Sequence, residues 1–230
     1  MNDMTRPDDC DPPYLHDAYG STRLRSPKQA LLTLPPGTLD IPGPFVPAGF
    51  VKDGENDLTA QGKALPLGER MILGGRLLDE DGRPIRRALV ELWQANAAGR
   101  YAHPGDQHDA PLDPNFTGFG RTFTDDDGAY RFITIKPGSY PWGNHRFAWR
   151  PQHIHFSLLG NAPVQRLITQ MYFPGDPLLA LDPVFNSVPD AKARARLIPT
   201  LALETGIEGV ALGYRFDIVL AGARATPLGL

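Results

Sequence analysis

Proline and glycine interrupt this chain so often that long helices have no room to form. The sequence holds 24 of each among its 230 residues, and the proline share is roughly twice the ordinary value of about 5%. Between these breakers lie short runs rich in Ile, Val, Leu, Phe and Tyr, the composition typical of strands. The runs span residues 71–78, 88–94, 129–134, 153–159, 167–173 and 214–220. The pattern predicts an all-β protein.

Turn residues separate neighbouring runs. Residues 79–82 and 125–128 both end in Asp-Gly, a dipeptide that tolerates the positive φ angles of tight turns. The acidic run 125–127 also resembles part of a calcium loop, but the other ligand positions of an EF-hand are missing, so we expect a turn. Residues 190–197 can form a short helix between two prolines. Short strands, few short helices and no internal repeat predict a β-sandwich of about eight strands.

The N-terminal part of the chain has a different character from the rest. Residues 1–66 are rich in proline and show little periodicity, so we expect an irregular but ordered N-terminal arm suited to an interface, followed by one β-sandwich domain over residues 67–230. Within the arm, Ser26 before a proline predicts a capped helix over residues 26–32. Disorder is the alternative, but the arm has more aromatic anchors than a disordered tail usually carries. These anchors are Tyr14, Tyr19, Phe45 and Phe50.

Charge and cysteine content narrow the classes of partner and compartment. Lys and Arg number 23 against 26 Asp and Glu, a formal net charge of −3, which gives no support for a nucleic-acid or anionic-membrane partner. A small organic substrate or a protein partner fits better. No apolar run approaches the roughly 18 residues of a transmembrane helix. Cys10 is the single cysteine and the N-terminus lacks the apolar run of a secretory signal, so we expect a cytoplasmic protein.

Two histidines separated by one residue give the strongest chemical signal. His153 and His155 lie in the strand-like segment 150–156, and alternate side chains of a strand project from the same face. A buried pair satisfied by carbonyl and carboxylate groups is one interpretation, and half of a metal site is the other. The sequence has no Cys pair, no HExxH helix and no acidic residue at ligand spacing nearby, which disfavours the usual zinc and Fe(II) patterns.

Two tyrosines can supply the anionic ligands that such a site still needs. Tyr101 and Tyr140 lie in segments marked by glycine and proline. A phenol with a pKa near 10 needs a strong Lewis acid to ionise it at pH 7, and a ferric ion is such an acid. Two phenolates and one hydroxide balance the charge of Fe(III), so the centre can be buried. The four side chains predict one ferric ion per chain.

These residues lie in segments that resemble the intradiol ring-cleavage dioxygenases. The resemblance runs from about Tyr19 to the C-terminus and is strongest over residues 89–96, 110–116, 149–156 and 214–220. Within the family, the segments are most similar to the β chains of members that cleave 3,4-dihydroxybenzoate. The resemblance implies a cytoplasmic, iron-dependent enzyme of aromatic catabolism in the β-ketoadipate pathway. The enzyme would use O₂ to convert 3,4-dihydroxybenzoate to 3-carboxy-cis,cis-muconate, in a hetero-oligomer with an α subunit of similar fold.

The resemblance also implies a separate role for each of the four metal ligands. Tyr101 and His153 match equatorial ligands of the ferric ion. His155 matches one axial ligand. Tyr140 matches the other axial ligand, the phenolate that leaves when substrate binds.

Four further residues match positions around the substrate in the same family. Arg150 would be a cation that faces the bound ring, or else a solvated surface residue. Gln170 matches a polar group near the oxygen pocket, and its alternative is ordinary hydrogen bonding within a strand. Trp142 matches an aromatic lining residue and Tyr19 one that reaches the substrate carboxylate, but packing and anchoring of the arm explain them equally. The histidines expected at the surface are His103, His108 and His145.

Two rival functions have distinct signatures. A homodimeric catechol or hydroxyquinol 1,2-dioxygenase would use the same four ligands, but those relatives carry a helical N-terminal dimerisation region, and residues 1–66 here are rich in proline. A prealbumin-like binding module would use the same tyrosines and histidines only for packing. Such a module would be colourless, whereas tyrosinate bound to Fe(III) gives a visible charge-transfer band.

Overall fold

A computed structural model of the chain describes residues 10–30, 32, 46–47, 49–143, 146–160 and 166–229. Its helical elements are short: α1 (Thr22–Arg25), η2 (Leu58–Ala60), η3 (Pro177–Ala180), α2 (Pro183–Asn186), α3 (Ala191–Ala195) and η4 (Leu203–Thr205). Its strands are β1 (Arg70–Leu78), β2 (Leu89–Trp93), β3 (Phe119–Phe123), β4 (Ala129–Ile135), β5 (Tyr140–Pro141), β6 (Trp149–Arg150), β7 (His153–Leu159), β8 (Arg166–Tyr172), β9 (Thr200–Leu201), β10 (Leu212–Arg215) and β11 (Ile218–Val219). The all-β prediction is confirmed. None of the helices in the described ranges is long and apolar enough to cross a membrane.

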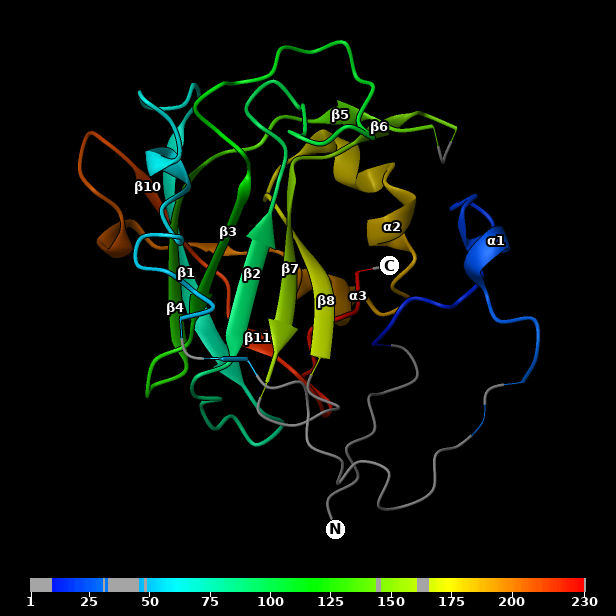
Figure 1. The fold of residues 1–230 in the computed structure, drawn as a ribbon. Coiled ribbons are helices and arrows are strands. Elements are labelled where there is room, and N and C mark those ends of the chain that lie inside the picture. Colours follow the sequence, from blue (N-terminus) through cyan, green and yellow to red (C-terminus); the bar gives the residue numbers. More distant parts are fainter. Residues whose placement is uncertain are drawn as a thin grey trace.

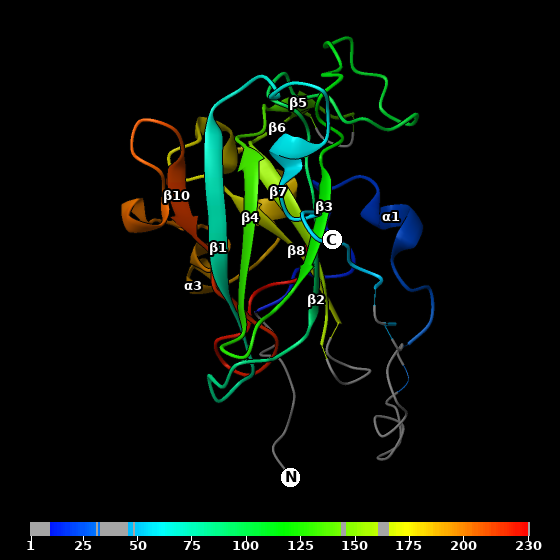
Figure 2. The same ribbon diagram turned by 60° about the vertical axis from the view of Figure 1, so that its left-hand side comes forward.

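The strands form two sheets that pack face to face (Figures 1 and 2). In the five-stranded sheet, β4 runs antiparallel along one side of β1, and β10 and β11 run parallel along successive parts of its other side. The second sheet has the order β3-β2-β7-β8, with every pair antiparallel. A small ribbon of β5 and β6 lies beyond one end of this second sheet (Figure 1).

One hydrophobic core fills the space between the sheets. In β7, Ile154 and Phe156 belong to it and are fully buried. The intervening residues of β7, His153 and His155, lie on the opposite, outer face, as strand alternation requires. The outer face beside β8 is covered by a smaller cluster in which Tyr172 packs with residues of the segment that carries α2 and α3. Side chains on the part of the outer face beside β8 are therefore enclosed as well.

The expected turns and the helix near residue 190 are confirmed. Gly82 and Gly128 both have positive φ angles, and each donates its backbone N–H to the carbonyl of the aspartate three residues earlier, at 3.1 Å. The short helix α3 begins after Asp190, whose carboxylate accepts hydrogen bonds from two backbone N–H groups of its first turn. Asp190 is thus an N-cap of the usual kind.

Two local expectations are wrong, and one strand was missed. Residues 26–30 are not helical; the helix of this region is α1, which ends where Ser26 begins an extended segment. Strand β3 was not expected, because its sequence FGRTF lacks a sustained apolar run. The run 214–220 is divided between β10 and β11, because the carboxylate of Asp217 accepts a hydrogen bond from the Arg76 backbone N–H and interrupts the pairing.

The described part of the N-terminal segment is held by the C-terminal residues. The Cys10 thiol donates to the Ala225 carbonyl at 3.2 Å, and the Asp11 carboxylate accepts the backbone N–H of Leu228 at 2.9 Å. The boundary expected between residues 66 and 67 stays a prediction. Phe45 and His145 lie outside the described residues.

Candidate metal centre and pocket

Strand register brings the two histidines to one end of the second sheet, beside the last residues of β2 and β8. His155 pairs with Trp93 of β2 on one side and with Gln170 of β8 on the other, while His153 pairs with Tyr172. Paired residues of antiparallel strands share a face, so these five side chains project together from the outer face. The Trp93 indole stacks on the His155 ring, with centroids 4.9 Å apart and planes 4° apart. The shared face predicted for the histidines is confirmed, with ring centroids 4.8 Å apart.

Two loops place Tyr101 and Tyr140 beside the histidine pair. The β5–β6 ribbon pairs Tyr140 with Arg150, just before β7. The loop that carries Tyr101 contacts the one before Tyr140 so closely that a Cβ added at Gly99 would lie 2.1 Å from the Ser139 carbonyl oxygen. The backbone N–H of Tyr101 donates to the Asp106 carboxylate at 2.7 Å. The Tyr101 and Tyr140 rings meet edge to face, 5.3 Å between centroids.

The four predicted ligand residues therefore form one continuous cluster. The Tyr140 ring lies 5.4 Å from that of His153, and the Tyr101 ring lies 6.4 Å from that of His155. In the part of the chain that the structure describes, no three His, Cys, Asp or Glu side chains gather in a way that would hold a metal. A metal at this cluster consequently needs the tyrosine oxygens.

The hydrogen bonds of the cluster fit a metal. The Tyr101 hydroxyl is buried and has no hydrogen-bond partner, which is costly for a polar group unless something occupies the space beside it. The Nδ1 atom of His153 lies 2.7 Å from the Pro151 carbonyl, so Nδ1 carries the proton and Nε2 keeps its lone pair. That lone pair faces the Tyr140 hydroxyl at 3.3 Å. A backbone carbonyl on the far nitrogen is the usual support of a metal-binding histidine.

Burial also sets the protonation states. It lowers the pKa of His155 to about 3 and that of His153 well below its ordinary value, with the positive charge of Arg150 adding to both effects. Both imidazoles are therefore neutral at pH 7, the form that binds metals. Burial, with the nearby Tyr140, raises the pKa of Tyr101 well above 10. Only a strong cation beside Tyr101 would ionise it.

Arg150 is buried, with 3% of its surface exposed, so the solvated-cation interpretation is wrong. Its Nη2 donates to the Gln170 side-chain oxygen at 2.8 Å and to the Tyr172 hydroxyl at 3.0 Å. Its Nη1 lies 3.2 Å from His153 Nε2. Burial acts to lower the pKa of Arg150, but Tyr172 and the Asp182 carboxylate outweigh it and hold the pKa well above its ordinary value.

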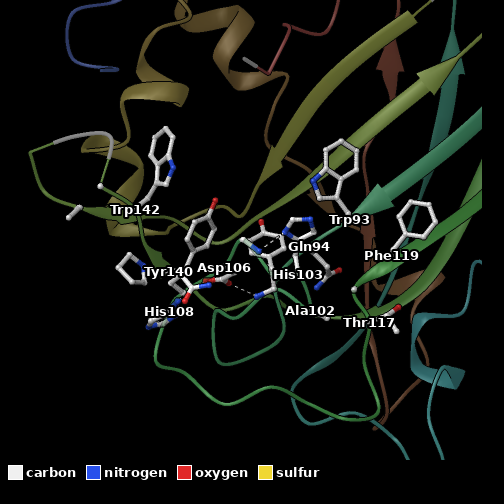
Figure 3. Close-up of a pocket in the computed structure, with 17 residues that line it drawn as sticks. Trp93, Gln94, Ala102, His103, Asp106, His108, Thr117, Phe119, Tyr140 and Trp142 are labelled. Atoms are coloured by element: carbon white, nitrogen blue, oxygen red, sulfur yellow. Dashed lines mark hydrogen bonds between the residues drawn. The ribbon is translucent and has the colours of Figure 1, made fainter. Parts of the chain in front are cut away.

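A pocket of about 950 Å³ opens beside this cluster, within the size range of small-molecule sites. Figure 3 shows Tyr140 and Trp142 on one side of it and Trp93 and Phe119 on the other. Trp142 also lies under the Arg150 guanidinium, 5.2 Å from ring centroid to Cζ. Tyr101 and Tyr140 thus line the pocket directly. Trp93 separates the pocket from His155, and Trp142 separates it from Arg150.

The remaining predicted residues lie around this pocket. Tyr19 is buried and packs edge-on against Trp142, with centroids 5.1 Å apart, without itself lining the pocket. His103 is exposed, as expected, and it lines the pocket together with His108. His108 is partly buried, and its Nδ1 lies 3.2 Å from the Gly99 carbonyl.

Two models of known protein families match the chain. A family model described as Dioxygenase matches residues 41–222, and one described as the N-terminal region of the protocatechuate 3,4-dioxygenase beta subunit matches residues 5–37. The chain belongs to the intradiol dioxygenase family.

The degree of similarity differs between members of the family. A protocatechuate 3,4-dioxygenase beta chain from Burkholderia cepacia is 57% identical over 94% of this chain and 93% of its own length. An alpha chain of the same name and organism is 33% identical over 69% of this chain and 76% of its own length. A 3-chlorocatechol 1,2-dioxygenase structure from Rhodococcus opacus shares the fold, with a TM-score of 0.56 and 24% identity over 77% of this chain and 69% of that one.

Sequence reasoning missed three residues that support the candidate site. Trp93 covers His155, and its signal was its place at the end of a strand, opposite the histidine run. Tyr172 is buried, and its hydroxyl donates to the Gln170 side-chain oxygen and accepts from Arg150. Asp182 pairs with Arg150 from 32 residues away in sequence. The Asp-Pro sequence could have marked Asp182 as the N-cap of a helix. No local pattern indicated that Asp182 pairs with Arg150.

Proposed function

We propose that this chain is the iron-binding β chain of a hetero-oligomeric protocatechuate 3,4-dioxygenase. It would hold one Fe(III) and use O₂ to cleave 3,4-dihydroxybenzoate to 3-carboxy-cis,cis-muconate. The convergence of Tyr101, Tyr140, His153 and His155 beside an open aromatic pocket carries the proposal. The similarity to the Burkholderia cepacia beta chain supports the substrate.

The donor atoms fit ferric iron better than other common metals. Two phenols and two neutral imidazoles match a trivalent ion, whose charge two phenolates and one hydroxide would balance. When bound, Fe(III) would supply Lewis acidity that ionises the ligand phenols and a bound catechol. All four donors come from one chain, so the chain would bind its iron without a ligand from a partner.

The chain's own residues would orient the substrate and manage its protons and charge. Tyr140 is only partly buried and lies at the pocket wall, so its oxygen can move away and accept a proton from a catechol hydroxyl. The Nη1 edge of Arg150 faces the cluster and would stabilise negative charge on the bound ring. Trp93 and Trp142 would exclude water from the walls of the site. The Gln170 side-chain oxygen accepts a hydrogen bond from Arg150 and so would hold the guanidinium against β8.

The open pocket mouth supports the partner chain. Phe119 lines the pocket and is 43% exposed, and Trp149, packed against the pocket-lining His108, is 45% exposed. Large exposed apolar groups at a pocket rim are typical of an interface. Matches to both alpha and beta chains fit a hetero-oligomer. We propose that an α chain covers this rim and contributes to recognition of the substrate carboxylate, together with Tyr19.

The single cysteine is buried and unbridged, which agrees with the cytoplasmic location that we propose.

Co-expression with a candidate α chain tests the function. We expect a coloured complex with one iron per β chain, and oxygen uptake with 3,4-dihydroxybenzoate that exceeds uptake with catechol. A colourless protein without iron would indicate a binding module. A β-only protein that is monodisperse and fully active on 3,4-dihydroxybenzoate would contradict the hetero-oligomer. Preference for catechol or hydroxyquinol would favour the homodimeric 1,2-dioxygenases.

A further inference from the structure

The carboxylate of Asp182 is the most completely enclosed charge near the candidate centre. Its exposed fraction is 0%. It lies at the N-terminus of the four-residue helix α2 and is held there by a backbone hydrogen bond, from its own N–H to the Leu178 carbonyl at 3.0 Å. Burial of a carboxylate at such a site is costly unless it is paired with a cation, and its partner is Arg150.

The pairing uses one whole edge of the guanidinium. Arg150 donates from Nη2 to Asp182 Oδ2 at 2.8 Å and from Nε to Oδ1 at 3.2 Å. Two parallel hydrogen bonds between planar groups fix both position and rotation, which a single contact does not. With that edge taken by Asp182, the remaining terminal nitrogen, Nη1, points to His153 Nε2 at 3.2 Å.

The other contacts of Arg150 do not select this orientation by themselves. Gln170 and Tyr172 both accept from Nη2, and these bonds leave rotation of the guanidinium plane about that nitrogen open. Trp142 contacts the group at 5.2 Å from ring centroid to Cζ, and stacking of this kind tolerates rotation within the plane. The two bonds to Asp182 are the contacts that set which nitrogen faces the site.

We infer that Asp182 is a positioning residue of the proposed dioxygenase reaction, acting through Arg150. Its carboxylate orients the guanidinium so that Nη1 faces the bound ring, and offsets the guanidinium charge on the side away from the substrate. The inference rests on the proposed function. Asp182 itself touches neither the pocket nor the four candidate ligands.

The test uses Asp182→Asn in the complex of this chain with its α partner. Asparagine keeps the size and one acceptor oxygen but replaces the other oxygen with a donor that repels Arg150. We expect near-normal iron content and a KM for 3,4-dihydroxybenzoate within twofold of the original, with kcat about 10- to 100-fold lower, since misplacement of a catalytic group by about 1 Å has effects of this size. Crystal structures of the original and variant complexes should show the guanidinium of Arg150 rotated in the variant, with Nη1 moved from its position in the original and the paired hydrogen bonds to residue 182 lost.

A double-mutant cycle separates positioning from general structural support. If Asp182 acts only through Arg150, Asp182→Asn should lower kcat no further in an Arg150→Ser background. Asp182→Glu, which keeps both acceptors but is one methylene longer, should restore part of the rate. It also serves as the test variant should the asparagine variant fail to fold. The matched control is Asp190→Asn, since Asp190 caps α3 and makes no contact with Arg150.

Failure of this inference and failure of the proposed function give different results. An unmodified complex without oxygen uptake on 3,4-dihydroxybenzoate would overturn the proposed function, whereas the crystallographic orientation of Arg150 would still test Asp182. The inference is overturned if kcat of Asp182→Asn stays within twofold of the original, or if its effect adds in full to that of Arg150→Ser. A loss of kcat that only parallels lost iron or lowered melting temperature also overturns it.

Discussion

Gly99 is the contact point at which the structure brings the two tyrosines together, so Gly99→Ala tests how their positions are set. The residue has a φ of +78°, and an added Cβ would lie 2.1 Å from the Ser139 carbonyl oxygen. The left-handed conformation costs a non-glycine residue about 1–2 kcal/mol, and overpacking typically adds about 1–3 kcal/mol. We expect Gly99→Ala to lower the free energy of unfolding by roughly 2–5 kcal/mol. We also expect the Tyr101 loop to shift relative to Tyr140.

The control is Gly175→Ala. Gly175 has nearly the same φ, +79°, but an added Cβ would meet nothing within 4 Å. Gly175→Ala should therefore lose only the stability that the left-handed conformation costs. This loss corresponds to a fall of about 2–8 °C in the apparent melting temperature. The difference between the two variants therefore isolates the clash at Ser139.

Melting temperature, iron content and the visible absorption band of the two purified complexes provide the assay. We expect Gly175→Ala to keep both iron and colour. Gly99→Ala should lose more stability and also bind iron more weakly or with a shifted band, because a displacement of about 1 Å spoils coordination geometry. If Gly99→Ala matched Gly175→Ala in all three measurements, close contact of the two loops would not be what positions the tyrosines.

Four further predictions follow from the site. His153→Ala should abolish iron retention, since no neighbouring donor fills the vacancy; metal analysis decides this, with the pocket-lining His103→Ala as a control that keeps its iron. Tyr140→Phe should bind iron but turn over slowly, because it lacks the phenolate that exchanges with substrate; an unchanged rate of oxygen uptake and an unchanged spectral response to substrate would exclude that role. Arg150→Ser should lower the rate far more than the iron content, and a parallel loss of both would mark Arg150 as structural. Iron-free protein should lose stability as the pH falls from about 6.5 towards 3, because burial holds the pKa of His155 at about 3 while the unfolded chain takes up the proton first, near pH 6.5; a melting temperature that stays constant over this range would contradict it.

Local periodicity was sufficient to predict the framework of the site. Alternation in β7 placed His153 and His155 on one face, because a strand in a sandwich has only two faces and the alternate residues Ile154 and Phe156 are apolar. The Asp-Gly turns were predictable for a similar reason, since few residues adopt positive φ without strain.

Partners that are distant in sequence were not predictable in the same way. The pairing of Arg150 with Asp182 depends on where the segment after β8 folds back, and no local pattern records that path. The Trp93 stack on His155 depends on the register between β2 and β7, which the sequence of either strand leaves open. The four ligand positions were inferred partly from a family resemblance, whereas the supporting residues became visible only through three-dimensional contacts.

The same strands that carry the candidate site also build the core, on opposite faces. In β7 the core residues Ile154 and Phe156 alternate with the two histidines, so packing of the inner face fixes the register of the outer face. A shift by one residue would exchange the two sets and expose Phe156 while burying the histidines between the sheets. The apolar residues therefore specify the site as well as stabilise the protein, and the geometry of the histidine pair depends on the core behind it.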